Sequence, residues 1–286
     1  MRTSIIALSG KVTLAALLAT ATPSFAQEAE EESSSDFTVS GNATVASDYR
    51  FRGASFSDGD VAIQGGIDLN HTSGFYVGVW GSSQDEGANS IGVDDGTGAI
   101  INVDSGDLGN VEIDIYGGWS GDVGGGLNLD VGLLYFYFPD ATQSVFNTGP
   151  GGVGGAPLLI GGSTDTPSDF FEPYITLSKS FGPVEANVGV NYAWSQSALG
   201  DNDSIYIHGG LSAGIPTTPI TVNANLGYTD GSLDVSGTGN YLDWLVGAEY
   251  AVTSNLTLGV AYTDTDAPSV NDSTDGAVVF TLGVSF

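Results

Sequence analysis

Two arginines and the aromatic residues beside them form the stretch of this sequence best equipped for chemistry. Residues 47–60 have the sequence Ser-Asp-Tyr-Arg-Phe-Arg-Gly-Ala-Ser-Phe-Ser-Asp-Gly-Asp, and they hold two of only five Lys and Arg residues in a chain with 34 Asp and Glu. In a β-strand, Tyr49 and Phe51 would face one side and Arg50 and Arg52 the other. Such a strand separates two unlike media, which we interpret as lipid outside and a watery, carboxylate-rich lumen inside.

The two guanidinium groups are expected to pair with carboxylates near the mouth of that lumen, because confined arginine favours carboxylate partners. Asp48 and acidic residues of neighbouring strands are the candidate partners. Two roles stay open for these pairs. They could create a transverse field that orients solutes at a constriction, or they could brace the wall and offset repulsion between carboxylates.

The sequence is poor in the residues that enzymes and metal sites require. It has no Cys and two His: His71 in a predicted periplasmic turn, and His208, which is predicted to face inward with no Ser nearby on the lipid face. The acidic stretches 83–109 and 139–169 lack the spacing of a calcium loop. We predict no enzyme, no cofactor and no metal site, with an aspartate-based site in these loops as a minor alternative. We interpret the loops as solvated, and divalent ions bridging to lipopolysaccharide as the alternative.

The N-terminal residues indicate export. Residues 1–26 begin with a positive charge, continue through an apolar stretch and end in Ser-Phe-Ala, as secretory signal peptides do. We expect cleavage after Ala26, followed by a flexible acidic leader over residues 27–36. The apolar stretch is too short to span a bilayer.

The charge of the mature chain excludes nucleic acid as a partner. After cleavage, three cations (Arg50, Arg52 and Lys179) stand against 34 acids, which gives 3 − 34 = −31. Phosphate contacts need a basic face, and this chain has none.

From Phe37 onward the sequence alternates apolar and polar residues with period two, which predicts strands rather than helices. Short and long links between the strands alternate, as do the periplasmic turns and extracellular loops of bacterial barrels. We therefore predict an all-β fold: a transmembrane antiparallel up-and-down β-barrel of about 12 strands over residues 37–286. The predicted strands are 37–52, 61–71, 74–82, 110–120, 126–138, 170–180, 183–196, 203–215, 219–229, 241–252, 255–263 and 277–286.

The two faces of the predicted strands differ in composition. One face is aliphatic with rings near the strand ends, which is typical of an aromatic girdle at a membrane interface. The predicted girdle residues are Tyr49, Phe51, Trp119, Tyr192, Trp194, Tyr228, Trp244, Tyr250, Tyr262 and Phe286. The predicted pore-lining residues of the other face are Asp48, Arg50, Arg52, Gln64, Asp68, Glu112, Asp114, Asp130, Glu172, Glu185, Asp243 and Glu249. Lumen-facing rings such as Trp80 and Tyr206 are expected to fill space, with stacking on a solute as the alternative.

The last predicted strand, residues 278–286, alternates cleanly and ends the chain on Phe286. It resembles the C-terminal strand of outer-membrane barrels, in which a terminal Phe is part of the signal that the barrel assembly machinery recognises. This resemblance implies the assembly machinery as a partner of Phe286.

Four short motifs carry a resemblance to a known family. They are Ser-Asp-Tyr-Arg-Phe-Arg-Gly (47–53), Ser-Asp-Gly-Asp (57–60), Ala-Ile-Gln-Gly-Gly (62–66) and Gly-Phe-Tyr-Val-Gly-Val-Trp-Gly-Ser (74–82). Together they resemble the TorF family of porin-like proteobacterial proteins, and Val61 departs from the Pro expected there. The resemblance covers roughly residues 37–82 and implies an outer-membrane barrel with a channel role, without an established substrate.

The sequence thus predicts a porin that passes small hydrophilic solutes by diffusion and favours cations mildly, because carboxylates outnumber guanidiniums in the lumen. The alternatives are a non-conducting structural or adhesive barrel and, less favoured, a soluble secreted β-sandwich. The expected location is the outer membrane, with its lipid and lipopolysaccharide as partners. No feature of the sequence marks a face for oligomer contacts.

Overall fold

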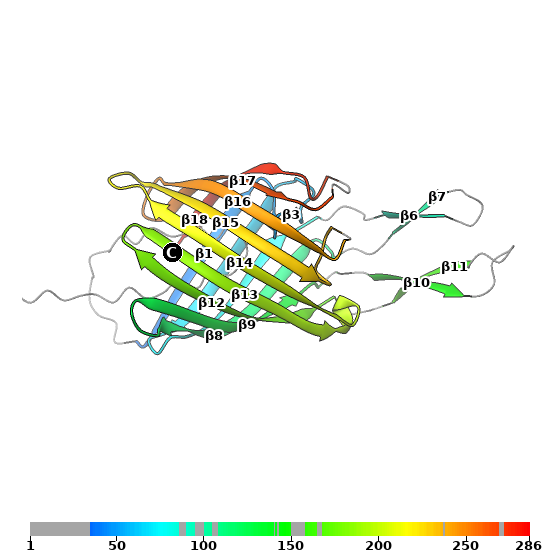
Figure 1. Ribbon diagram of the computed structural model, residues 1–286, viewed down its shortest axis with the longest axis horizontal. Coiled ribbons are helices and arrows are strands. Elements are labelled where there is room, and N and C mark those ends of the chain that lie inside the picture. Colours follow the sequence, from blue (N-terminus) through cyan, green and yellow to red (C-terminus); the bar gives the residue numbers. More distant parts are fainter. Residues whose placement is uncertain are drawn as a thin grey trace, which may run out of the picture.

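Twelve antiparallel strands close into a barrel in the computed structural model of the chain (Figure 1). The structure describes residues 35–85, 90–94, 100–104, 108–139, 141, 143–149, 158–164, 168–236, 238–268 and 272–286. The predicted signal peptide and most of the acidic leader lie outside these residues. No helix among the described residues is long and apolar enough to cross a membrane.

The barrel strands follow one another in chain order, and each pairs with its neighbours in an antiparallel register. They are β1 (Phe37–Ala46), β4 (Ala62–His71), β5 (Phe75–Ser83), β8 (Val111–Asp122), β9 (Leu127–Tyr137), β12 (Phe170–Phe181), β13 (Val184–Gln196), β14 (Asn202–Gly214), β15 (Ile220–Gly231), β16 (Asn240–Ala251), β17 (Leu256–Thr265) and β18 (Ala277–Ser285). The prediction of a closed antiparallel barrel of about 12 strands is confirmed.

Shorter elements lie in the loops at one end of the barrel. Figure 1 shows the hairpins β6–β7 and β10–β11 beyond this end, which we call the upper end. The hairpin β2–β3 belongs instead to the loop between β1 and β4. These elements are β2 (Arg50–Phe51), β3 (Ala54–Ser55), β6 (Ser90–Asp94), β7 (Ile100–Asp104), β10 (Gln143–Gly149), β11 (Leu158–Thr164) and the 3₁₀ turn η1 (Ser197–Leu199).

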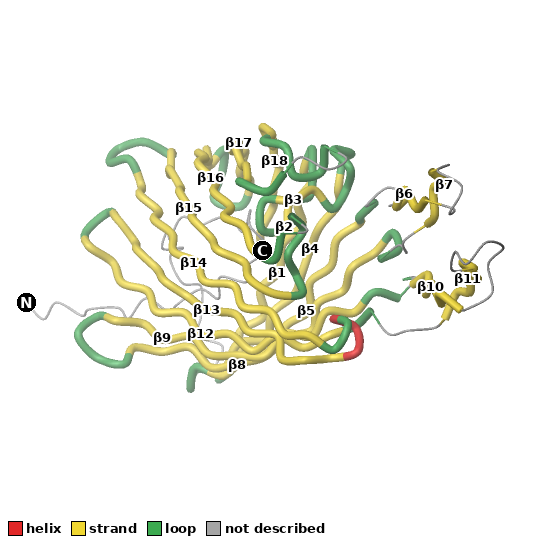
Figure 2. The backbone as a smooth tube through the Cα atoms, turned by 45° about the vertical axis from the view of Figure 1, so that its right-hand side comes forward, coloured by secondary structure: helices red, strands yellow, loops and turns green. Residues whose placement is uncertain are grey.

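The first and last strands close the barrel, so that its wall has no free edge (Figure 2). β1 pairs with β18 from Asn42 opposite Ser285 to Ala46 opposite Thr281. Beyond this ladder, Gly41 and Phe286 exchange backbone hydrogen bonds of 2.8 and 3.0 Å. Closure satisfies the backbone groups that an open edge strand would expose.

The wall is apolar outside and polar inside. The outward side chains of Ile63, Val246 and Phe280 are 66%, 62% and 60% exposed. In the same strands, inward positions such as Asp243 and Thr281 are buried. This is the reverse of a water-soluble protein and suits a barrel surrounded by lipid.

A charge on the outer face should therefore destabilise the barrel. Replacing Val246, in the middle of β16, by Lys should lower the free energy of unfolding by about 2–4 kcal/mol, the usual cost of a cation near the bilayer midplane. The measurement is denaturant unfolding of the protein in lipid vesicles. Asn223→Lys is the matched control, because Asn223 faces inward on the adjacent strand and pairs with Gly247. Equal stability of the two variants would contradict a lipid-facing outer wall.

Candidate functional site in the barrel lumen

The chain turns into the barrel where the first strand ends. Ala46 at the end of β1 pairs with Ala62 at the start of β4. Residues 47–60, which we call the inward loop, fold into the lumen between these strands, and Arg52 is only 1% exposed. The predicted strand 37–52 is therefore wrong beyond Ala46. The physical reason is that β4 offers no residues with which 47–52 could continue the ladder.

A tight turn in the inward loop sets the position of Arg52. β2 and β3 form a small hairpin around Arg52 and Gly53, whose φ angles are 48° and 84°. Positive φ at both central residues is the pattern of a type I′ turn. Glycine is needed at position 53, because an added Cβ would lie 3.0 Å from the Cβ of Asp243 and closer still to Thr265.

The carboxylate of Asp48 organises the inside of the loop. It accepts hydrogen bonds from the Nε of Arg50 at 2.5 Å and from the Oγ atoms of Ser55 and Ser57 at 2.6 and 3.1 Å. Ser57 also accepts a 2.8 Å hydrogen bond from the backbone N–H of Tyr49. These contacts satisfy a carboxylate that is only 4% exposed, so the loop has a polar centre of its own.

The guanidinium group of Arg52 joins the tip of the loop to the barrel wall. Its Nη2 donates to both carboxylate oxygens of Glu172 on β12, at 2.8 and 2.6 Å. Asn191 on β13 donates a further 2.7 Å hydrogen bond to Glu172. The guanidinium carbon also lies 4.3 and 4.7 Å from the ring centroids of Tyr206 and Phe51, within cation–π range. The pair is almost completely removed from solvent.

Two more contacts attach the loop to other parts of the barrel. Nη1 of Arg50 donates to the carbonyl oxygens of Ser273 and Asp275, at 3.1 and 2.8 Å, in the segment before β18. The Tyr49 hydroxyl lies 3.1 Å from both carboxylate oxygens of Glu112 on β8. The inward loop therefore touches walls that are distant from one another in the strand order.

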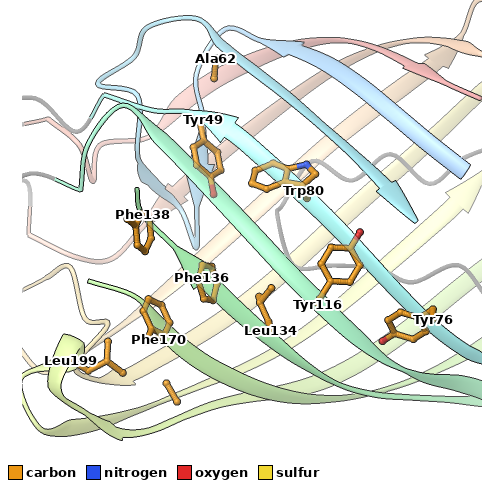
Figure 3. Packing of buried hydrophobic residues seen from close by; sticks show 11 residues of the cluster. Tyr49, Ala62, Tyr76, Trp80, Tyr116, Leu134, Phe136, Phe138, Phe170 and Leu199 are labelled. Atoms are coloured by element: carbon orange, nitrogen blue, oxygen red, sulfur yellow. The ribbon is translucent and has the colours of Figure 1, made fainter. Parts of the chain in front are cut away.

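Aromatic side chains fill the space around the loop, as Figure 3 shows for the cluster beside Tyr49. The Tyr49 ring lies 5.8 Å from that of Trp80, and Phe51 lies 5.8 Å from Phe136. Phe136 stacks in turn on Phe170 of β12 at 4.5 Å. The expectation that lumen-facing rings fill space agrees with this packing. The buried cluster consists of Tyr49, Ala62, Tyr76, Trp80, Tyr116, Leu134, Phe136, Phe138, Phe170, Ala193 and Leu199.

The half of the lumen that holds the loop is filled on every side. Each of the 12 barrel strands contributes at least one inward side chain that is no more than 9% exposed. One such residue from each strand, in chain order, is Ala46, Ala62, Trp80, Glu112, Phe136, Glu172, Ala193, Tyr206, Thr229, Asp243, Thr263 and Val279. A water-filled path along the wall would expose some of these residues. At this level, each barrel strand therefore has an inward side chain that is shielded from solvent.

The opposite half of the lumen is polar and more open. Its inward residues include Asn128, Glu185 and Asn187, which are half-buried or exposed. Hydroxyl–carboxylate contacts form the boundary between the halves, with Tyr76 donating to Asp130 at 2.6 Å. Tyr116 likewise donates to Asp68 at 2.5 Å, and Tyr76 also contacts the hydroxyl of Tyr174.

The predicted pore-lining residues all lie inside the barrel, but they occupy two different parts of it. Asp48, Arg50 and Arg52 lie on the inward loop and not on the wall. The wall residues face inward, as the alternation predicts, and their contact with solutes stays a prediction. Among them, Glu112, Asp114, Asp130, Glu172, Asp243 and Glu249 are buried, Gln64 and Asp68 are half-buried, and Glu185 is exposed.

Two predicted girdle residues are misplaced. Tyr49 is 3% exposed, and Phe51 packs against the interior cluster, so their assignment to an outer girdle is wrong. The alternation that placed them outside assumed a strand, and the chain is not a barrel strand there. The remaining predicted girdle residues lie on the outward face, where lipid contact stays a prediction: Trp119, Tyr192, Trp194, Tyr228, Trp244, Tyr250, Tyr262 and Phe286.

Some members of the site were not predicted from the sequence. Gly53, Ser55 and Ser57 fall between the predicted strands 37–52 and 61–71, where an extracellular loop is expected, although they shape the inward loop. The sequence does hold a sign that the first strand ends early. The predicted strand 37–52 is five residues longer than its predicted neighbour 61–71, so its last residues have no partner in the wall. His208 lies inside the barrel, stacked on Tyr206 at 5.3 Å. Within the described ranges, no group of three or more His, Asp or Glu is arranged to hold a metal.

Several buried polar atoms near Arg52 have no hydrogen-bond partner in the described part of the chain. They include Nε and Nη1 of Arg52 and Oδ2 of Asp243. A buried donor without a partner costs free energy. Fewer of the buried polar atoms at the tip of the loop therefore have hydrogen-bond partners than of those around Asp48.

Comparisons with known proteins show the family of the chain and a fold that it shares with a solved structure. A family described as "Bacterial protein of unknown function (Gcw_chp)" matches residues 30–149 and 158–286. No curated protein matches the sequence. The fold is similar to that of a NanC porin, with a TM-score of 0.51 and 11% identity over 87% of this chain and 99% of that chain. This similarity shows a shared barrel fold.

Two other solved porins match less well. A KdgM porin, solved in complex with disordered oligogalacturonate, has a TM-score of 0.49 and 8% identity over 86% of this chain and 98% of that chain. Pseudomonas putida OprB has a TM-score of 0.38 and 16% identity over 84% of this chain and 61% of that chain.

Removing one partner of the buried ion pair should destabilise the protein strongly. Glu172→Gln should lower the free energy of unfolding by about 3–5 kcal/mol, because it leaves the Arg52 charge buried without a counter-charge. Glu185→Gln, which makes the same charge change at an exposed inward position, should stay within about 0.5 kcal/mol. Denaturant unfolding measures both. A double variant, Arg52→Met with Glu172→Leu, should recover most of the free energy of unfolding that Glu172→Gln loses. Equal stability of Glu172→Gln and Glu185→Gln would contradict the role of the buried pair.

Proposed function

We propose that this chain, which belongs to the Gcw_chp family of bacterial proteins of unknown function, is a porin-like channel of the bacterial outer membrane. Small hydrophilic solutes diffuse through it, and cations pass more readily than anions. The observation that carries the proposal is the contrast between the two faces of the closed barrel. The outer face is apolar, and the inner face carries carboxylates.

The outer face supports a location in a membrane. Large apolar side chains such as Ile63 and Val246 are more exposed there than a protein in water would tolerate over a continuous surface. Rings such as Trp194 and Tyr250 lie near the C-terminal ends of β13 and β16, which run in opposite directions, so the two rings lie near opposite ends of the barrel and suit the two interfaces of a bilayer. Outer-membrane lipid and lipopolysaccharide are the proposed surroundings.

The charges of the wall support a preference for cations. Asp68 and Glu185 face the more open half of the lumen, and fixed carboxylates in a confined space attract cations and repel anions. Lys179, the lone cation in the described barrel strands, occupies an outward position with its Nζ 5.8 Å from the ring of Phe181. No described inward wall position carries Lys or Arg.

The remaining parts of the proposal concern export and assembly. We propose that residues 1–26 are removed as a signal peptide, that residues 27–36 form a periplasmic leader, and that Phe286 is part of the signal for the barrel assembly machinery. The resemblance of residues 47–82 to TorF porins is a narrower form of the same family proposal. No enzymatic role is proposed.

A second candidate function is a non-conducting structural or adhesive barrel. The filled half of the lumen is the observation that favours it, because each barrel strand there has an inward side chain that is shielded from solvent. Single-channel recording separates the two functions. Discrete current steps from the purified, refolded protein in a planar bilayer support the channel, and a silent bilayer with correctly folded protein supports the structural barrel.

A channel lined by carboxylates should also show a cation-selective reversal potential. Under a potassium chloride gradient, the zero-current voltage should be shifted from zero toward the equilibrium potential of potassium. The double variant Asp68→Asn with Glu185→Gln should move this voltage back toward zero. Asp203→Asn with Asp230→Asn is the control, because it removes two carboxylates that receive hydrogen bonds from the outward tyrosines Tyr192 and Tyr228. A reversal potential on the anion side would refute the proposed selectivity.

A further inference from the structure

We infer that the inward loop (residues 47–60) is a displaceable plug, that the Arg52–Glu172 pair latches it shut, and that its departure leaves a purely anionic pore. This inference rests on the proposed channel function and deepens it, because it couples opening to selectivity. Four observations carry it: the completeness of the wall without the loop, the path of the loop, the nature of its attachments and the location of the cations.

The barrel wall is complete without the inward loop. β1 pairs with β4 from Phe37 opposite His71 to Ala46 opposite Ala62, and with β18 as far as Thr281. The loop begins after the last of these rungs, and its own hairpin, β2–β3, forms a separate small sheet. Moving residues 48–60 out of the lumen therefore breaks no rung of the barrel, while Ser47 keeps its hydrogen bonds with Phe280 of β18.

The loop crosses the lumen from one wall to the other. It leaves the wall at β1, and its tip residue Arg52 binds Glu172 on β12. In the closed strand order, β12 is five strands from β1 through β4 and seven strands through β18. A segment that contacts nearly opposite sides of a ring of 12 strands obstructs it, which agrees with the burial of inward residues on every strand.

The loop is attached to the wall by hydrogen bonds, by the Arg52–Glu172 pair and by the rings of Tyr49 and Phe51, which pack on Trp80 and Phe136. Beyond its base, its backbone bonds to the segment before β18 through Ser55 N and Ser273 O at 2.8 Å, and to Asp85 N through Phe56 O at 2.9 Å. Nε and Nη1 of Arg52 and Oδ2 of Asp243 have no partner in the described structure. These groups would gain hydrogen bonds to water when the loop leaves, which lowers the cost of opening.

The loop also carries the positive charges of the lumen. Arg50 and Arg52 belong to the loop, whereas Lys179, the remaining cation of the described residues, lies on the outside of β12. When the loop moves out, both guanidinium groups leave the lumen, and Glu112, Glu172 and Asp243 lose their nearest positive charges. Among the described residues, the charged groups that line the open pore are therefore all carboxylates, so opening should strengthen the preference for cations.

The test is to remove the plug. Residues 48–60 are replaced by Asn-Gly, a two-residue turn that can join β1 to β4. A Glu172→Gln background removes the carboxylate that would otherwise lose its guanidinium partner, Arg52. Heat-modifiable migration in gels verifies that the barrel folds. Planar-bilayer recordings should show severalfold higher conductance than the unmodified protein, with a reversal potential shifted further to the cation side.

Point variants test the latch with the loop intact. Glu172→Gln should raise the frequency or duration of open states, because it removes the counter-charge of Arg52. Glu185→Gln is the matched control, since it makes the same charge change away from the loop, and it should keep the closed-state pattern of the unmodified protein. Equal gating in the two variants would overturn the assignment of Glu172 as the latch.

The outcomes separate this inference from the proposed function. If the unmodified protein and the plug deletion conduct equally and with equal selectivity, the plug is overturned while the channel stands. If both are silent although both fold, the channel and the plug are overturned together. A deletion that raises conductance without a cation-directed shift overturns the coupling between opening and selectivity.

Discussion

The arrangement of the lumen depends on one buried ion pair, Arg52 with Glu172. Taking a guanidinium and a carboxylate out of water is costly, and their attraction repays that cost only when the geometry is good and other groups complete the contacts. Here the hydrogen bond from Asn191 and the ring faces of Tyr206 and Phe51 supply those contacts. Such a pair adds little net stability over an apolar substitute, but it fixes position. It determines where the tip of the inward loop lies, and the aromatic cluster packs around that position.

The lumen combines two kinds of interior within one barrel. Near the loop it resembles the core of a soluble protein, with rings in contact and little solvent, and farther away it is lined by asparagines and carboxylates. Glycines on neighbouring strands make room for the rings. Gly78 lies opposite Tyr116, and Gly118 lies opposite Tyr76, and in both places an added Cβ would collide with the ring. Part of the high glycine content of the chain therefore follows from filling a narrow barrel with aromatic side chains.

The alternation of residues predicts the barrel well, because the medium on each side of a strand selects side chains directly. It predicts the number of strands, the order of short and long links and the direction of wall residues such as Glu112 and Glu172. It fails for Tyr49 and Phe51, because the residues around the small hairpin β2–β3 also alternate between aromatic and charged types. In the sequence, this pattern looks the same as that of a wall strand. The predicted strand 37–52 is longer than its predicted neighbour 61–71, which indicates that its last residues have no strand to pair with. Their backbone groups must then find other partners, so these residues leave the wall. That Arg52 would meet Glu172 could not be predicted, because the pairing depends on how a loop crosses the barrel.

The width of the barrel explains why a loop is needed at all. About eight strands enclose a space that wall side chains can fill, and a barrel of 12 strands is wider. Some wall rings meet directly, as Phe136 and Phe170 do, and the inward loop adds its own rings, with Phe51 packing on both Phe136 and Phe56. A filling segment must also bring charges that offset the inward carboxylates, and placing them on the loop leaves the wall free of cations. Closure and charge compensation are therefore properties of the same 14 residues, 47–60, and the barrel cannot lose one without losing the other.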